Sequence, residues 1–117
     1  MDMRNGKPSA KVSTEAMVRL CQLCMNYHSE QRYPQLDLKW SGKVVDAEIN
    51  GDVATSKQQI KAEGKGSGEV HLNAKYLTRA LAKMGEHVKF TPCESASFWE
   101  SGDLCVAAMQ LRAPTKT

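Results

Sequence analysis

The sequence lacks any long run of apolar residues. The longest uninterrupted stretches, such as residues 104–109, are far shorter than the roughly 18 residues that a membrane-spanning helix needs. The chain also lacks, at its start, the charged segment followed by an apolar one that marks a secretory signal. We therefore expect a cytoplasmic protein that does not contact a membrane.

Glycine and proline are scarce, with 8 and 4 residues among 117, whereas the hydrophobic fraction is an ordinary 41%. These values exclude a low-complexity chain and do not indicate disorder. A chain of this length buries roughly two-thirds of its unfolded surface as one domain. Because both ends are aperiodic, we predict one domain over residues 10–112, with flexible tails at 1–9 and 113–117.

A large charge excess is also missing. The 16 Lys and Arg residues against 13 Asp and Glu residues leave a net charge of +3. That value alone does not indicate a nucleic-acid-binding protein, so the distribution of the charges must decide.

No catalytic or cofactor motif emerges. Cys21 and Cys24 have the spacing of redox and zinc sites, but they fall in the middle of a predicted helix on its apolar face. Burial there raises the pKa of a thiol, and Cys93 and Cys105 do not complete a zinc site. The histidines at 28, 71 and 87 lack an acidic pattern typical of a metal site or a catalytic dyad. We expect no enzyme, no cofactor and no metal, and we interpret the thiols as core residues.

The elements that periodicity predicts occur twice in the same order. The first set is a short strand at 10–12, a helix from Ser13 or Thr14 to about 28, and strands at 36–40, 45–49 and within 53–62. The last of these strands is polar, which indicates exposure or a sheet edge. Glycines 64, 66 and 68 then predict a flexible connection. They do not indicate a phosphate-binding loop, because no Lys-Ser/Thr pair follows them. The second set is a strand at 69–72, a helix at 74–84 with Tyr76 on its apolar face, and strands at 88–90, 96–100 and 104–112.

An offset of 60 aligns the two helical regions residue by residue. It places Ser13 on Asn73, both suited to cap a helix, and Met17 on Leu77. At the next strand the offset falls to 50, where Trp40 meets Phe90. We predict an α+β fold built from a duplicated β-α-β-β-β unit, with repeat one at 10–63 and repeat two at 68–112. Each unit is too small to fold alone, so the two helices should pack on a shared antiparallel sheet.

Residues 68–81, with the sequence Gly-Glu-Val-His-Leu-Asn-Ala-Lys-Tyr-Leu-Thr-Arg-Ala-Leu, resemble a segment of the bacterial DNA sliding clamp, the DNA polymerase III beta subunit. In that family a strand leads through an Asn cap into a helix beginning Tyr-Leu or Tyr-Val. Residues 88–90 and 106–111 occupy the places of the last strands of the clamp. The resemblance spans about 10–112 and implies one clamp-like domain, similar to the C-terminal third of a subunit that serves as a replication processivity factor.

The end of the chain departs from the clamp pattern. Clamps end on a Met-Pro-Met-Arg-Leu type strand that helps to form a pocket for short peptide motifs of replication proteins. The matching residues here are Ala107-Ala108-Met109-Gln110-Leu111, which keep only the second Met and the Leu. The resemblance therefore makes Met109 and Leu111 the peptide-pocket candidates.

Lys75, Arg79 and Lys83 recur every four residues on the second predicted helix, and no acidic residue lies between 74 and 85. This spacing sets three cations in a row about 6 Å apart, close to the distance between successive phosphates of a DNA strand. Arg19 holds the equivalent position on the first helix, although Glu15 lies one turn before it. By spacing alone the row fits a solvated helix face as well. The resemblance implies that these helices line the channel of a ring and contact the DNA backbone without reading sequence.

Two hypotheses follow. The first is a sliding-clamp-like protein that binds double-stranded DNA as a symmetric oligomer, for which six copies would supply the six domains of a closed ring. The second is a clamp-derived module, regulatory or carried by a mobile element, that binds a protein or a small ligand without encircling DNA.

Overall fold

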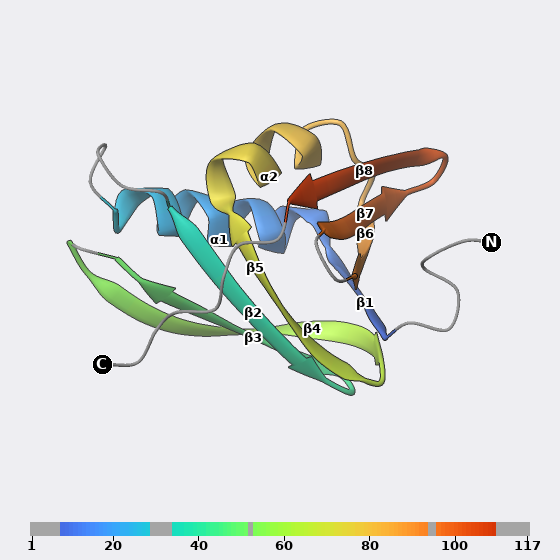
Figure 1. Cartoon of the computed structure of the whole chain (residues 1–117), viewed down its shortest axis with the longest axis horizontal. Helices are drawn as coiled ribbons and strands as arrows, with labels where there is room; N and C mark the ends of the chain where they lie inside the picture. Colours follow the sequence, from blue (N-terminus) through green and yellow to red (C-terminus); the bar gives the residue numbers. More distant parts are fainter. Residues whose placement is uncertain (1–7, 29–33, 52, 94–95, 110–117) are drawn as a thin grey trace.

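The computed structural model describes residues 8–28, 34–51, 53–93 and 96–109. Within these ranges the order β-α-β-β-β occurs twice, as the sequence predicts (Figure 1). The first unit comprises β1 (Ser9–Ser13), α1 (Thr14–Asn26), β2 (Gln35–Ser41), β3 (Val44–Asn50) and β4 (Thr55–Lys65). The second comprises β5 (Ser67–Asn73), α2 (Ala74–Leu81), β6 (His87–Pro92), β7 (Ala96–Ser101) and β8 (Leu104–Met109). The predicted tails and the last predicted strand residues, 110–112, fall largely outside the described ranges.

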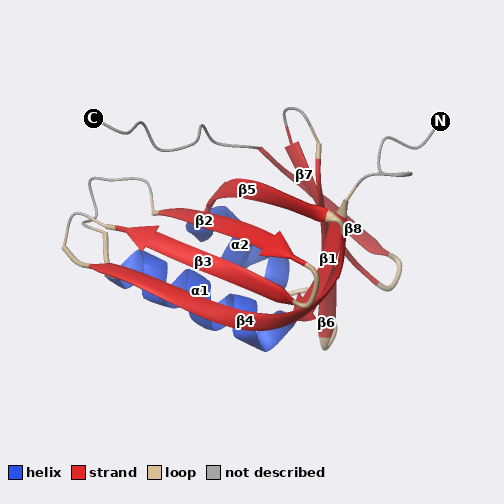
Figure 2. Ribbon diagram, turned by 90° about the horizontal axis from the view of Figure 1, so that it is seen from below, coloured by secondary structure: helices blue, strands red, loops and turns tan. Residues whose placement is uncertain are grey.

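The described strands form one antiparallel sheet in the order β5-β2-β3-β4-β1-β6-β7-β8. The two units interlock, because β1 of the first unit pairs with β6 of the second and β5 of the second pairs with β2 of the first. Figure 2 shows both helices on one side of this strongly curved sheet. The predicted α+β architecture is therefore confirmed.

Strand β4 connects the two halves of the sheet. Its residues 55–61 pair with β3, and its residues 62–65 pair with β1. The prediction that the strand within 53–62 is exposed or at an edge is confirmed for residues 55–61, where most side chains reach solvent and β3 is the one pairing partner among the described strands. The strand continues beyond the predicted end to Lys65, and there it pairs with β1. A polar strand can lie inside a sheet when only one of its faces is covered.

An aromatic cluster lies at the centre of the core. The ring of Phe90 meets Trp40 edge to face at 5.1 Å and stacks on Trp99 at 4.7 Å between centroids. The flexible connection predicted at the three glycines is wrong. Gly64 lies in β4, Gly68 lies in β5, and only Gly66 forms the turn, with φ of 74°. A Cβ atom on Gly68 would lie 2.7 Å from the Trp40 ring, so this strand position accepts the indole only because it lacks a side chain.

Both helices begin at the predicted caps. The Ser13 hydroxyl accepts the Ala16 N–H at 3.3 Å, and the Asn73 side chain accepts the Lys75 N–H at 3.0 Å. Both helices end earlier than periodicity predicts, at Asn26 and at Leu81. After α2 the backbone tightens, because Lys83 and Met84 donate to carbonyls three residues earlier.

The Asn50-Gly51 dipeptide is typical of a tight hairpin turn, but the structure gives Gly51 a different role. The sequence suggests a hairpin whose residues take positive φ, yet among the described residues only Gly42, Gly66 and Gly102 do so. Position 51 requires glycine because the backbone of Tyr27 lies too close for a side chain: a Cβ atom would lie 1.8 Å from the Tyr27 carbonyl oxygen. That oxygen accepts the Val53 N–H at 3.1 Å, which fastens the β3–β4 turn to the end of α1.

Candidate nucleic-acid interface

The side of α2 that faces away from the sheet carries the predicted cations. Ala74, Leu77 and Leu81 are buried against the sheet, whereas Lys75 and Arg79 are exposed one turn apart. Lys83 is also exposed, although it lies beyond the last helical residue, so the predicted row does not belong to a single helix. Within the described ranges none of these three side chains, here called the α2 row, forms an ion pair.

Tyr76 belongs to this outward side and not to the apolar face that the sequence predicts. Its side chain is 67% exposed. At 100° per residue, Tyr76 lies near Arg79 around the helix axis and far from Ala74. Counting Tyr as apolar hid this position, and a helical projection centred on the buried residues reveals it.

Helix α1 presents a neutral outward side. The Arg19 guanidinium lies 2.6 Å from the Glu15 carboxylate, and the two side chains are 74% and 76% exposed. The helices pack against each other on the same face of the sheet (Figure 2), so the neutral and basic sides are neighbours. Among the ion pairs between described residues, Arg19 is the one of the four predicted DNA-binding residues that is engaged by an acid.

Some charges on the opposite face of the sheet have neighbours of opposite sign. Lys39 of β2 lies between Glu69 of β5 and Asp46 of β3 in the strand register. In the other half of the sheet, Lys89 lies 4.0 Å from Glu100. Cross-strand neighbours of opposite sign cancel locally. On β4, however, Lys57, Lys61 and Lys65 are exposed and form no ion pair among the described residues, so unpaired cations lie on the sheet side as well as on the helix side.

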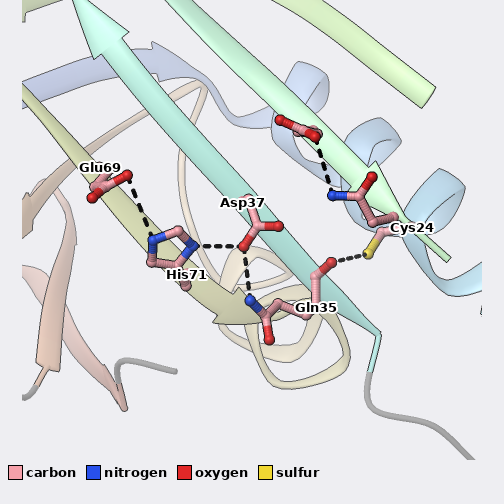
Figure 3. A network of polar contacts seen from close by, with 7 residues as sticks. Cys24, Gln35, Asp37, Glu69 and His71 are labelled. Carbon is pink, nitrogen blue, oxygen red and sulfur yellow. Dashed lines mark hydrogen bonds and ion pairs between the residues drawn. The ribbon is translucent and has the colours of Figure 1, made fainter. Parts of the chain in front are cut away.

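A polar network joins β2 to β5 (Figure 3). His71 Nδ1 lies 2.6 Å from Asp37 Oδ1, which also accepts a hydrogen bond from the Gln35 side chain at 2.8 Å. Glu69 lies 3.7 Å from His71 Nε2, a buried nitrogen without a hydrogen-bond partner. The sequence missed the partner of His71 because Asp37 precedes it by 34 residues and only the β2–β5 register brings them together. The network ties an outer strand to its neighbour.

The helical cysteines are suited to packing. Burial raises the pKa of the Cys21 and Cys24 thiols to about 12, so both stay protonated at neutral pH. Cys24 donates to the Gln35 carbonyl at 3.2 Å. His28 Nδ1 lies 2.7 Å from the Cys24 carbonyl oxygen and 3.9 Å from its sulfur, so this nitrogen donates to the backbone and does not act as a base toward the thiol.

Other predicted positions are partly visible. Met109 ends β8 with 79% of its surface exposed, while Leu111 lies outside the described residues. Among the residues that the structure covers, no group of three or more His, Cys, Asp and Glu side chains is placed to hold a metal ion. No described helix is long and apolar enough to cross a membrane.

Solved structures provide the decisive comparison. The DNA polymerase sliding clamp of Pseudomonas aeruginosa matches 94% of this chain with a TM-score of 0.81 at 19% identity. The sliding clamps of Bartonella birtlesii and C. crescentus each match 97%, with TM-scores of 0.82 and 0.81 at 13% and 14% identity. The chain has the fold of a single sliding-clamp domain. The predicted resemblance is confirmed at the level of the fold.

The clamp-domain fold accounts for only part of each clamp chain. The matches cover 32% to 34% of those proteins, so this chain spans about one-third of their length. No family model and no curated protein sequence matches the chain. Identities of this size establish the arrangement of the backbone, and the function must be argued from the side chains.

Proposed function

We propose that this protein is a non-enzymatic DNA-binding protein that contacts the phosphate backbone of duplex DNA through α2 without reading sequence. The observation that carries the proposal is the α2 row: Lys75, Arg79 and Lys83 are exposed, and within the described ranges they form no ion pair. The solved structures reported above are of DNA polymerase sliding clamps. Cations without an acidic partner can replace the counterions around phosphates, and this exchange requires no base contact.

The size of the row sets the strength of binding. Three cations that neutralise three phosphates give a slope of log K against log salt of about −2.7. Raising the salt from 50 to 200 mM then weakens binding about 40-fold. Such weak and salt-dependent contact suits a protein that moves along DNA.

The assembly that we propose uses two of the open strand edges of the sheet. In the described part of the chain, β8 pairs only with β7, and residues 55–61 of β4 pair only with β3. The two edges have similar lengths, and β8 carries no charged side chain to protect it. We propose that β8 of one copy pairs with β4 of the next, which is a head-to-tail contact that closes as a ring when the rotation allows it. Six copies would provide the six domains expected of a clamp ring.

The direct test is a binding titration with fluorescently labelled duplexes of unrelated sequence at 50 and 200 mM salt. We expect equal affinities for the different sequences and the salt dependence given above. If the folded protein does not bind duplex DNA at 50 mM salt, the proposal is wrong.

Light scattering at micromolar concentration tests the assembly separately. We expect a mass of several copies, with six for a closed ring. A monomer would contradict the ring. The binding titration would then show whether a single domain contacts the DNA backbone.

A second candidate function is binding of a protein partner as a clamp-derived module. It is favoured by the large apolar side chains that the structure leaves exposed, including Tyr76 at 67% and Met109 at 79%. They lie on α2 and β8, which contact each other. A folded monomer that fails to bind DNA would favour this function over the first.

A further inference from the structure

We infer that Glu15 limits the DNA affinity of the helix side by engaging Arg19, so that α2 alone contacts phosphates. This inference rests on the proposed function. It concerns a difference between two helices that the duplicated fold makes equivalent.

Helices α1 and α2 are equivalent in the structure as well as in the sequence. Each helix begins directly after a capping residue, Ser13 or Asn73, and Glu15 and Lys75 are each the second helical residue. One turn later both helices carry an arginine, Arg19 or Arg79. The two outward sides therefore differ in the sign of the charge at the second helical position, and the first repeat has Leu23 where the second has Lys83.

The ion pair is formed and lies in solvent. Arg19 Nη2 is 2.6 Å from Glu15 Oε1, with both side chains about three-quarters exposed. An acid placed four residues before a base is the favoured orientation on a helix, and the first turn of a helix stabilises a carboxylate. Glu15 and Arg19 are the charged residues of α1, so the outward side of this helix has no net charge. A phosphate that approached Arg19 would meet the Glu15 carboxylate, which lies 2.6 Å from the guanidinium.

Removing the charge of Glu15 should therefore add one phosphate contact. We expect Glu15→Gln to steepen the slope of log K against log salt by about 0.9 and to raise affinity about tenfold at 50 mM salt. The fold should be unaffected, because an exposed pair of this kind contributes little to stability. Circular dichroism and the thermal midpoint verify the fold of each variant.

Glu48→Gln is the matched control, because Glu48 is an exposed acid on β3 and the variant has the same net charge. Adding Arg19→Gln to Glu15→Gln should remove the gain, whereas Arg19→Gln alone should change affinity less than twofold. An equal effect of Glu15→Gln and Glu48→Gln would overturn the inference, as would a gain that persists without Arg19. If the unmodified protein does not bind DNA, the proposed function itself fails, which is a different result from binding that Glu15→Gln leaves unchanged.

Discussion

We expect reversal of the charge of the α2 row to abolish retention of duplex DNA. In the variant that combines Lys75→Glu, Arg79→Glu and Lys83→Glu, three attractive contacts with phosphates become repulsive, so the loss exceeds the effect of removing the cations alone. We expect no measurable binding at 50 mM salt in the titration described above. The three side chains are exposed and form no ion pair among the described residues, and a glutamate at position 75 lies in the first turn of a helix, where a negative charge is favourable. The variant should therefore fold.

The control variant must change the net charge by the same amount as the α2 variant, but on another surface of the protein. Lys11, Lys43 and Lys65 are exposed on β1, in the β2–β3 turn and at the end of β4. Their combined replacement by Glu should weaken binding only through the overall charge, and far less than the α2 variant does. Equal losses in the two variants would show that α2 is not the contact surface, and unchanged retention in the α2 variant would contradict the proposal outright.

Replacing Trp40 by alanine produces the largest loss of stability that we expect from a single substitution. The side chain is buried, packs edge to face on Phe90, and rests on Gly68, which has no side chain to move into the space. Truncating a buried Trp costs about 3–5 kcal/mol, because transfer energy is lost and a cavity remains. That is a large share of the roughly 5–15 kcal/mol that stabilises a domain. Urea unfolding followed by circular dichroism measures the change.

Two further variants separate packing from other effects. The buried indole nitrogen of Trp40 has no hydrogen-bond partner, so Trp40→Phe should cost less than Trp40→Ala because it removes only part of the packing. Tyr76→Ala is the aromatic control on the exposed side of α2 and should change stability by no more than about 0.5 kcal/mol. If Trp40→Ala lowers the free energy of unfolding by less than about 1 kcal/mol, the aromatic cluster does not contribute substantially to the stability of the fold.

Local sequence patterns predict the helices and strands, but they do not predict which distant segments lie side by side. Ser13 and Asn73 were recognisable as caps because capping depends on neighbouring residues, and the alignment of Trp40 with Phe90 placed two aromatic rings that meet in the core. The exchange of β1 and β5 between units depends on pairing over long separations, which periodicity does not encode. For the same reason the contact of Gly51 with Tyr27 could not be read from the Asn-Gly dipeptide.

The candidate site was predicted to a similar extent. Helical spacing placed Lys75 and Arg79 on an exposed side, and the structure agrees. The early end of α2 displaced Lys83 from the helix, because the last turn tightened in a way that side-chain periodicity does not report. The spacing of Glu15 and Arg19 suggests that they can interact, and the structure places their charged groups 2.6 Å apart.

The interlocked strands bear on how such a domain could arise. In this structure the first strand of each unit pairs with the second strand of the other unit: β1 with β6, and β5 with β2. A lone β-α-β-β-β unit would leave its first strand without this neighbour. Two separate chains could supply these neighbours to each other by reciprocal exchange around a twofold axis. An unduplicated ancestor would therefore have reached this core as a homodimer, and gene fusion would have turned a concentration-dependent assembly into a single folding unit.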